Sequence, residues 1–299
     1  MTKTGYVALI GLPNSGKSSI LNALLGEKIS IVTAKPQTTR KRILGILSEE
    51  NYQIIFLDTP GIVKPAYLLH EKMLEHIDSS LEDADIIVLI YDVSSDIRLK
   101  EAEENELIKK IINEKKKPII LVLNKVDTIT QEKTNELINK YTGQYNFDAV
   151  IPVSALLNFN LESLREKIIE FLPSAPKLYP DDIISEETER FFVSEIIREK
   201  IFELYEDEIP YSSEVIIADF KEREKGKDLI RAEIIVERES QKPIIIGKDG
   251  RAIKKLGQLS RKSIEEFLQR EVYLDLRVKV RNKWRSNEKI LKSFGYAVK

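Results

Sequence analysis

A loop near the start of the chain has the residue types and the spacing that bind a nucleoside triphosphate. The sequence GLPNSGKS, Gly11 to Ser18, matches the pattern G-x-x-x-x-G-K-[ST] and lies between an apolar run and a segment of helical period. The glycines allow backbone N–H groups to surround a phosphate, and the following helix points its positive dipole end at the same place. The expected phosphate-binding residues are Gly11, Pro13, Asn14, Ser15, Gly16, Lys17, Ser18 and Ser19.

Two further motifs supply groups that a phosphate-bound Mg²⁺ needs. DTPG, Asp58 to Gly61, offers a carboxylate that can hold the ion through water and a glycine N–H that can bond the γ-phosphate. In AKPQTTRKR, either Thr38 or Thr39 could close over the ion, and we prefer Thr39; both could instead simply lead into the next strand. The expected metal ligands are Ser18, Thr39 and Asp58, and the expected catalytic residues are Lys17, Thr39, Asp58 and Gly61.

The residue after this glycine predicts the rate of hydrolysis. Ras-type enzymes carry a glutamine there, which orients the attacking water, whereas this chain carries Ile62. An isoleucine side chain cannot hydrogen-bond water. We therefore predict slow intrinsic hydrolysis, with the water positioned by backbone groups, by a bound ion or by a partner.

Two short motifs after later strands identify the base. In NKVD, Asn124 to Asp127, the Asp127 carboxylate can accept from guanine N1–H and from the exocyclic amine, whereas adenine would leave it unpaired. In SAL, Ser154 to Leu156, the N–H of Ala155 can meet guanine O6. The expected guanine-binding residues are Asn124, Lys125, Asp127, Ser154, Ala155 and Leu156.

The elements that must position these motifs follow from the apolar pattern. Near-continuous apolar runs alternate with charged segments of helical period, which indicates a parallel sheet covered on both faces. One extra strand is expected to pair antiparallel across the turn-like SEENYQ. This is a doubly wound α/β domain that ends with the helix Leu161–Leu172. The expected strands are Tyr6–Ile10, Ile43–Leu47 (antiparallel), Ile54–Leu57, Ile86–Tyr91, Ile119–Leu123 and Val150–Val153.

A proline-rich stretch, PSAPKLYPDD, separates this part from a second domain. Proline disfavours helix continuation and gives a stiff, extended connection. We place the first domain at residues 1–173, a linker at 174–182 and a smaller α+β domain at 183–299. Its expected elements, in the order α-β-β-α-α-β, include helix Glu186–Tyr205, strands Glu214–Phe220 and Leu229–Glu237, helix Arg251–Arg270 and strand Val272–Val280.

A second glycine loop, in KPIIIGKDGRAIKKLG, differs from the first in its spacing. Only two residues separate the glycines of GKDG, so the loop cannot surround a triphosphate, but it can approach a sugar-phosphate backbone closely. We expect Ile246, Ile253 and Leu256 to form an apolar floor. Few aromatics lie nearby, so recognition is expected to depend on base edges and aliphatic packing more than on stacking. The expected RNA-binding residues are Ile246, Gly247, Lys248, Asp249, Gly250, Arg251 and Lys254.

The charge distribution supports RNA binding by the second domain, and the composition excludes sites that need cysteine. Residues 242–299 carry 16 basic and 6 acidic side chains, which attracts a polyanion, whereas residues 181–241 carry 9 and 19. There is no cysteine, so disulfides, thiolate metal sites and thiol nucleophiles are excluded. The longest apolar runs are strand-sized, and we expect a cytoplasmic protein.

The motifs together resemble those of a known family. GLPNSGKSS, QTTR, DTPG, NKVD and SAL resemble the TRAFAC GTPases, and IIIGKDGRAIKKLG resembles a type II KH RNA-binding domain. One G domain followed by one such domain resembles the Era family of bacterial ribosome-assembly GTPases. The resemblance implies Mg²⁺ and GTP or GDP as bound groups, ribosomal RNA at the 3′ end of the 16S molecule, and a role in small-subunit maturation. It also implies peripheral association with the inner face of the membrane alongside RNA binding; we expect a monomer.

Two other classes of function stay open from the sequence. One is an RNA-binding scaffold in which the nucleotide is structural and never cycles, although Lys17, Ser18 and Asp58 argue against it. The other is a GTPase whose basic C-terminal part binds acidic membrane lipid.

Overall fold

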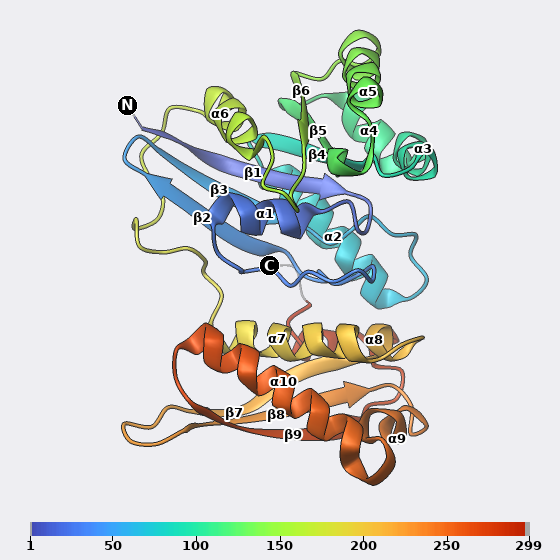
Figure 1. Cartoon of the computed structure of the whole chain (residues 1–299), viewed down its shortest axis with the longest axis vertical. Helices are drawn as coiled ribbons and strands as arrows, with labels where there is room; N and C mark the ends of the chain where they lie inside the picture. Colours follow the sequence, from blue (N-terminus) through green and yellow to red (C-terminus); the bar gives the residue numbers. More distant parts are fainter. Residues whose placement is uncertain (1, 297–299) are drawn as a thin grey trace.

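The computed structural model describes residues 2–296 and contains two separate β-sheets, which lie one above the other in Figure 1. The first sheet has six strands in the order β2-β3-β1-β4-β5-β6, and only the β2–β3 pair is antiparallel. The predicted parallel sheet and its antiparallel extra strand are thus confirmed. The strands are β1 Lys3–Gly11, β2 Ile43–Glu49, β3 Tyr52–Asp58, β4 Ile86–Asp92, β5 Ile119–Asn124 and β6 Ala149–Val153.

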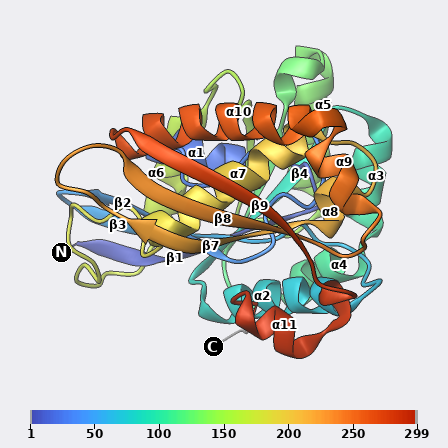
Figure 2. The same ribbon diagram turned by 90° about the horizontal axis from the view of Figure 1, so that it is seen from below.

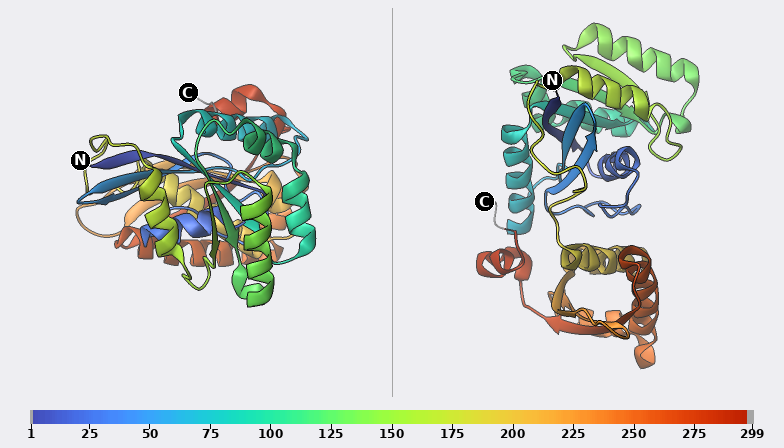
Figure 3. Two further views of the ribbon diagram at one scale, coloured as in Figure 1. Left: turned by 90° about the horizontal axis from the view of Figure 1, so that it is seen from above. Right: turned by 90° about the vertical axis from the view of Figure 1, so that its left-hand side faces the viewer.

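Helices cover both faces of this sheet, as the near-continuous apolar strands require. On one face, α1 and α6 pack against alternate residues of the central strands, and α2, α3, α4 and α5 pack on the other. Figure 3 shows the two helical layers with the sheet between them. The helices are α1 Lys17–Leu25, α2 Leu68–Asp83, α3 Asp96–Glu104, α4 Glu106–Glu114, α5 Gln131–Gln144 and α6 Leu161–Phe171, with a 3-10 helix, η1, at Val126–Thr128.

The second sheet has three strands in the order β7-β8-β9, antiparallel between β7 and β8 and parallel between β8 and β9. Helices α7 and α10 pack on it, and their apolar residues form one core with the strands. In Figure 1, α7 lies on the side that faces the first sheet. The elements are α7 Glu189–Leu204, α8 Ile209–Ser212, β7 Glu214–Lys221, β8 Asp228–Val236, α9 Gln241–Ile246, η2 Lys248–Gly250, α10 Arg251–Leu268, β9 Val272–Val280, η3 Trp284–Ser286 and α11 Glu288–Ser293.

The segment between the two sheets is attached to the edge of the first one. The Gln53 side chain accepts from the N–H of Leu178 at 2.8 Å and of Tyr179 at 3.0 Å, and donates to the Tyr179 carbonyl at 2.8 Å. The N–H of Ile46 donates to the carbonyl of Ile184 at 2.7 Å. These bonds hold the connecting segment against β2 and β3, so it is not a free tether.

The C-terminal segment returns to the first domain. Trp284 is fully buried, and its Nε1 donates to the Ser212 carbonyl at 2.9 Å. With Leu291 and Phe294 it forms an apolar cluster that includes Leu69 and Met73 of α2. Figure 2 shows α11 beside α2. Within residues 2–296, no helix combines the length and apolarity that a membrane crossing requires.

Candidate functional site

A cavity of about 580 Å³ opens at the carboxyl ends of the parallel strands, where ligands of open α/β sheets bind. The loop after β1, the segment before β2, and the loops after β5 and β6 all reach it. The structure thus brings together motifs that lie more than one hundred residues apart in the sequence. The predicted residues that line it are Pro13, Asn14, Gly16, Lys17, Ser18, Ser19, Thr39, Gly61, Asn124, Lys125, Asp127, Ala155 and Leu156. Those that are buried beside it, outside its lining, are Gly11, Ser15, Asp58 and Ser154.

The glycine loop has a conformation that requires glycine at Gly16. The residue has φ +97°, and a Cβ built on it would lie 2.0 Å from Asn124 Nδ2. Asn124 in turn donates to the carbonyl of Ser15 at 2.8 Å. The loop after β1 is therefore fixed directly against the loop after β5, so the phosphate and base ends of the cavity share one support.

The predicted phosphate-binding lysine is buried at the start of α1. Lys17 Nζ donates to the carbonyls of Gly11 and Leu12 at 3.2 and 3.0 Å. Burial lowers the pKa of Lys17 to about 8, against a smaller opposing effect of the Asp58 charge. An ammonium in this position is poorly solvated, so phosphate oxygens would be strongly favoured partners.

This lowered pKa predicts a pH dependence of GTP binding. The free protein loses the Lys17 proton above pH 8, whereas bound phosphates favour the charged lysine, so binding takes up a proton and weakens as pH rises. We expect the Kd for GTP to rise about threefold between pH 7.5 and 8.5. Equilibrium titration of Lys17→Arg supplies the control, because arginine stays charged throughout this range. An equal slope in the two proteins would contradict the assignment.

Oxygen donors gather beside this lysine. Ser18 Oγ lies 2.7 Å from Asp58 Oδ2 and 2.9 Å from Thr39 Oγ1, and Ser30 Oγ donates to the same carboxylate at 2.9 Å. Burial raises the pKa of Asp58, and these serine hydroxyls and Lys17 oppose that rise. Its Oδ1 is buried and has no hydrogen-bond partner among residues 2–296. A buried carboxylate with a free oxygen beside two hydroxyls is a suitable donor set for Mg²⁺. Of the two candidate threonines, the structure brings Thr39, and not Thr38, to Ser18.

The DTPG motif lies against the glycine loop. A Cβ on Gly61 would lie 2.7 Å from Pro13 Cα, so only glycine allows this approach of the two backbones. The N–H of Ile62 donates to the carbonyl of Gly11 at 3.1 Å, and its side chain is buried in the core beneath. The isoleucine side chain therefore points away from the cavity and cannot place a water there.

The base end of the cavity is arranged partly as predicted. Asp127 and Leu156 are exposed and line the cavity, and Leu156 is 82% exposed. The N–H of Ala155, expected to meet guanine O6, donates instead to Asn124 Oδ1 at 3.2 Å. Ser154 is buried, and its Oγ accepts from the N–H of Leu157 at 3.2 Å. Asn124 and Ser154 thus shape the loops, and Asp127 is the free acceptor for a base.

Sequence reasoning missed the other wall of the cavity. The part of the segment before β2 that precedes AKPQTTRKR contributes side chains and backbone that carry no motif, and Val32 among them is 41% exposed. Its only signal was its position between the two phosphate motifs. The lining residues outside any motif are Ile31, Val32, Thr33 and Thr128, whereas Ala34, Gln37 and Thr38, which also line the cavity, belong to AKPQTTRKR.

The second glycine loop forms a tight turn between α9 and α10. Gly247 and Gly250 both have φ +73°, and Asp249 between them has φ +53°. The side chains of Lys248, Asp249 and Arg251 are exposed. The turn therefore presents backbone and basic side chains at the N-terminus of a long helix, which suits a phosphate chain. Of the remaining predicted residues, Lys254 is exposed and Ile246 half-buried.

A groove of about 490 Å³ lies between α10 and β9, and its helix side begins at Ile253, just after this turn. Gly257 lies on its helix side; a Cβ there would contact Leu276 Cδ1 at 3.6 Å, so a larger side chain would narrow the groove. Tyr273, 60% exposed, lies on its strand side and supplies an aromatic surface that the sequence reasoning had not placed there. For the helix side of the groove the sequence did contain a signal, because Ile253, Gly257 and Arg261 are spaced one helical turn apart and so lie on one face.

The three residues expected to form an apolar floor at the second glycine loop do not share one surface. Ile246 is half-buried and lies outside the groove lining, and the Leu256 side chain is fully buried in the core of the second domain. Ile253, three residues earlier, does line the groove. Leu256 and Ile253 point in different directions because α10 is strongly amphipathic and its buried stripe runs through Leu256, Ser260 and Ile264.

Comparison with known proteins gives the same two parts. The family described as "50S ribosome-binding GTPase" matches residues 6–125, and the KH domain family matches residues 208–285. GTPase Era of Clostridium botulinum strain Hall is 43% identical over 296 residues, covering 99% of each chain. The chloroplastic GTPase ERA1 of Zea mays is 46% identical over 296 residues, covering 98% of this chain and 70% of the relative.

Solved structures agree over the whole chain. Era in complex with MgGDPNP and nucleotides 1506–1542 of 16S ribosomal RNA superposes with TM-score 0.90 at 39% identity, covering 100% of both chains. A single-substitution variant of Aquifex aeolicus Era bound to GDP·AlF4⁻ gives TM-score 0.89 at 39% identity, covering 99% of this chain and 100% of the other.

Proposed function

Because the chain belongs to the Era family of GTPases, we propose that it is a GTP-hydrolysing switch that binds the 3′ end of 16S ribosomal RNA during small-subunit assembly. The observation that carries this proposal is one chain with two different glycine loops, one in a nucleotide-sized cavity and one beside an open basic groove. The relative solved with MgGDPNP and 16S RNA supports the pairing of ligands. We assign residues 1–173 to the GTPase domain, 174–182 to the linker and 183–299 to the KH domain.

Each side chain at the phosphate end of the cavity has a proposed role in binding the phosphates or Mg²⁺. Lys17 would bind the β- and γ-phosphates, and the loop from Gly11 to Ser19 would surround them with N–H groups. Ser18 and Thr39 would hold Mg²⁺ directly, with Asp58 behind them and Gly61 donating to the γ-phosphate. The ion, when bound, neutralises charge that develops on the phosphates. Position 62, where Ras-type enzymes carry the water-orienting glutamine, holds a buried isoleucine, so we expect slow turnover.

The base end would recognise guanine mainly through Asp127. Its carboxylate accepts the two N–H groups that only guanine presents together. Lys125 is held by Asp92 at 2.6 Å, which leaves the aliphatic part of its side chain beside the cavity. Asn124, Ser154, Ala155 and Leu156 would hold the loop around the base.

RNA would bind across the GKDG turn and into the groove beside it. The backbone from Ile246 to Gly250 would approach the sugar-phosphate chain, and Lys248, Arg251 and Lys254 would pair with phosphates. Gly257 leaves room for a base, and Tyr273 offers it a stacking surface.

Replacing Gly250 by aspartate tests the clamp. No atom lies within 4 Å of a Cβ on Gly250, so the new carboxylate adds charge without overlap. We expect the affinity for a 16S 3′-end RNA, measured by fluorescence anisotropy, to fall at least about tenfold through phosphate repulsion. GTP affinity should stay unchanged.

The matched control is Gly226→Asp, in the turn between β7 and β8. Gly226 also has positive φ, +91°, and also has no atom within 4 Å of its Cβ position. The two variants therefore carry similar backbone strain and the same charge change. Equal loss of RNA affinity in both would contradict the proposed clamp.

We further propose that the protein acts as a cytoplasmic monomer, with any membrane contact peripheral. The basic residues of the last fifth of the chain would support such contact through anionic lipid head groups.

A further inference from the structure

The segment that carries Thr39 is held by the second domain along much of its length. The N–H of Val32 donates to Glu199 Oε1 at 3.1 Å, and Lys28 Nζ lies 2.7 Å from Glu199 Oε2. Lys35 Nζ donates to the carbonyls of Phe202 and Tyr205 at the end of α7. One wall of the nucleotide cavity therefore rests on a helix of the RNA-binding domain.

At the far end of the segment, Arg40 is fixed in the same way. Its guanidinium is 2% exposed and donates to three backbone carbonyls around α8, at 2.7 to 3.2 Å, and to Glu214 Oε2 at 3.2 Å. These acceptors all belong to the second domain. Both ends of the segment are thus anchored, and the threonines lie between the anchors.

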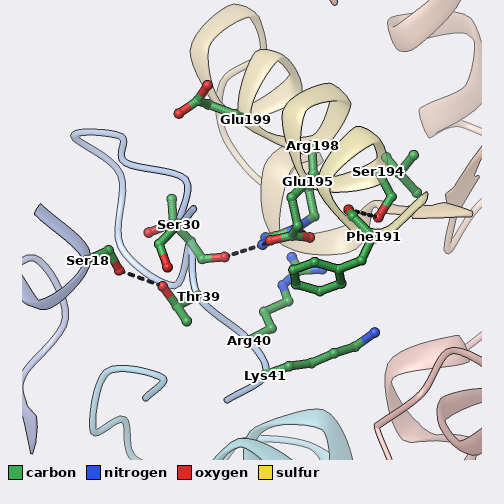
Figure 4. A network of polar contacts seen from close by, with 12 residues as sticks. Ser18, Ser30, Thr39, Arg40, Lys41, Phe191, Ser194, Glu195, Arg198 and Glu199 are labelled. Atoms are coloured by element: carbon green, nitrogen blue, oxygen red, sulfur yellow. Dashed lines mark hydrogen bonds and ion pairs between the residues drawn. The ribbon is translucent and has the colours of Figure 1, made fainter. Parts of the chain in front are cut away.

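Between these anchors, one arginine of α7 reaches the backbone next to Thr39. Arg198 is 1% exposed, and its Nη2 donates to the carbonyl of Thr38. Its Nε donates to Glu195 Oε1 at 2.8 Å, which fixes the guanidinium on its own helix. Figure 4 shows Arg198 pointing from α7 toward the segment on which Thr39 faces Ser18.

Burial of Arg198 makes its hydrogen bond to the Thr38 carbonyl costly to break. A buried guanidinium needs acceptors, and Arg198 Nη1 already has no hydrogen-bond partner within the described part of the chain. Movement of the Thr38 carbonyl would remove a further acceptor in a place that water does not reach. Arg198 therefore favours the segment conformation in which the Thr39 hydroxyl lies 2.9 Å from Ser18 Oγ.

We infer that Arg198 is a positioning residue for GTP hydrolysis: the RNA-binding domain uses it to hold the Thr38 carbonyl and so to set Thr39 in the site of the other domain. This inference rests on the proposed function. Arg198 does not line the nucleotide cavity, so it would act on the rate of hydrolysis through Thr39 and not on nucleotide binding.

The test compares steady-state hydrolysis in the full chain. Arg198→Met combined with Glu195→Gln removes the contact without leaving a buried carboxylate unpaired. We expect kcat to fall about tenfold, the effect of one hydrogen bond to a charged donor, with KM for GTP and Kd for GDP within about twofold of wild type. Arg198→Lys, which keeps the charge and an N–H donor, should recover part of kcat.

Two controls separate positioning from general stability. Arg190→Met alters an exposed arginine on the same helix, away from the Thr38 contact, and should retain wild-type kcat; Glu195→Gln alone loosens the support of the Arg198 guanidinium and should lower kcat by less than the double variant. If the double variant fails to fold in a thermal melt, Arg198→Gln combined with Glu195→Gln, which keeps a polar terminus at position 198, carries the same expectation. A folded variant with wild-type kcat would overturn the inference, whereas wild-type protein that neither binds nor hydrolyses GTP would overturn the proposed function itself and the inference with it.

Discussion

Replacing Asp127 by asparagine is expected to change the preferred base from guanine to xanthine. Asp127 is exposed at the base end of the cavity, where its carboxylate can accept from guanine N1–H and from the amine at C2. Asparagine would present an N–H group to that amine, so one bond is lost and two donors oppose each other. Since a hydrogen bond to a charged group contributes about 1.5–3 kcal/mol, the loss of one such bond, the opposed donors and the weaker remaining bond to a neutral acceptor should together weaken GTP binding about 100-fold.

Xanthine carries an oxygen at C2 and keeps N1–H, so it complements the asparagine amide. We therefore expect the variant to bind XTP more tightly than GTP, measured by displacement of a fluorescent nucleotide. Asp96→Asn, at an exposed position of α3, has the same charge change away from the cavity and should keep the wild-type preference. A variant that weakens GTP and XTP binding equally would show that Asp127 does not read the base.

Gly16→Ala is expected to abolish nucleotide binding because the loop and Asn124 cannot both keep their places. The new methyl group would lie 2.0 Å from Asn124 Nδ2, inside any real contact distance. The Asn124 side chain can avoid this overlap only by moving away, which breaks its 2.8 Å hydrogen bond to the Ser15 carbonyl. The loop then loses its support. We expect the affinity for GTP and GDP to fall more than about 100-fold by calorimetry, since the loop supplies most phosphate contacts.

Gly26→Ala is the control for backbone strain. Gly26 ends α1 with φ +70°, and no atom lies within 4 Å of its Cβ position. The substitution should cost about 1 kcal/mol of stability, the usual penalty for a left-handed alanine, and leave nucleotide affinity near wild type. If Gly26→Ala lost as much affinity as Gly16→Ala, general destabilisation and not loop geometry would explain the effect.

Much of the architecture could be predicted from apolar periodicity. The strand expected at Val272–Val280 coincides with β9, because apolar and polar residues alternate with period two along its length. The helix expected from Glu186 begins at Glu189 instead. Thr188 is the reason, since its side chain caps the helix by accepting from the N–H of Phe191 at 3.3 Å. A capping residue was therefore readable in the sequence and outweighs periodicity at a helix end.

The site residues could be predicted where a motif fixes the local backbone. They could not be predicted where a residue distant in the sequence determines which hydrogen bond is made. The positions of Lys17, Ser18 and Asp58 follow from loops at strand ends, which parallel topology brings to one edge of the sheet. The N–H of Ala155, by contrast, is taken by Asn124, and no local pattern indicates that choice. The contact between Arg198 and Thr38 joins residues 160 positions apart and depends on how the two domains meet.

In the proposed switch, the nucleotide controls RNA binding through the contact between the domains. The direct measurement is the affinity of the full chain for a 16S 3′-end RNA, once with Mg²⁺ and GDP and once with Mg²⁺ and the non-hydrolysable analogue GDPNP. We expect RNA to bind at least about tenfold more tightly with GDPNP, a coupling of about 1.4 kcal/mol. Equal affinities in the two nucleotide states would contradict the switch and identify a constitutive RNA-binding scaffold.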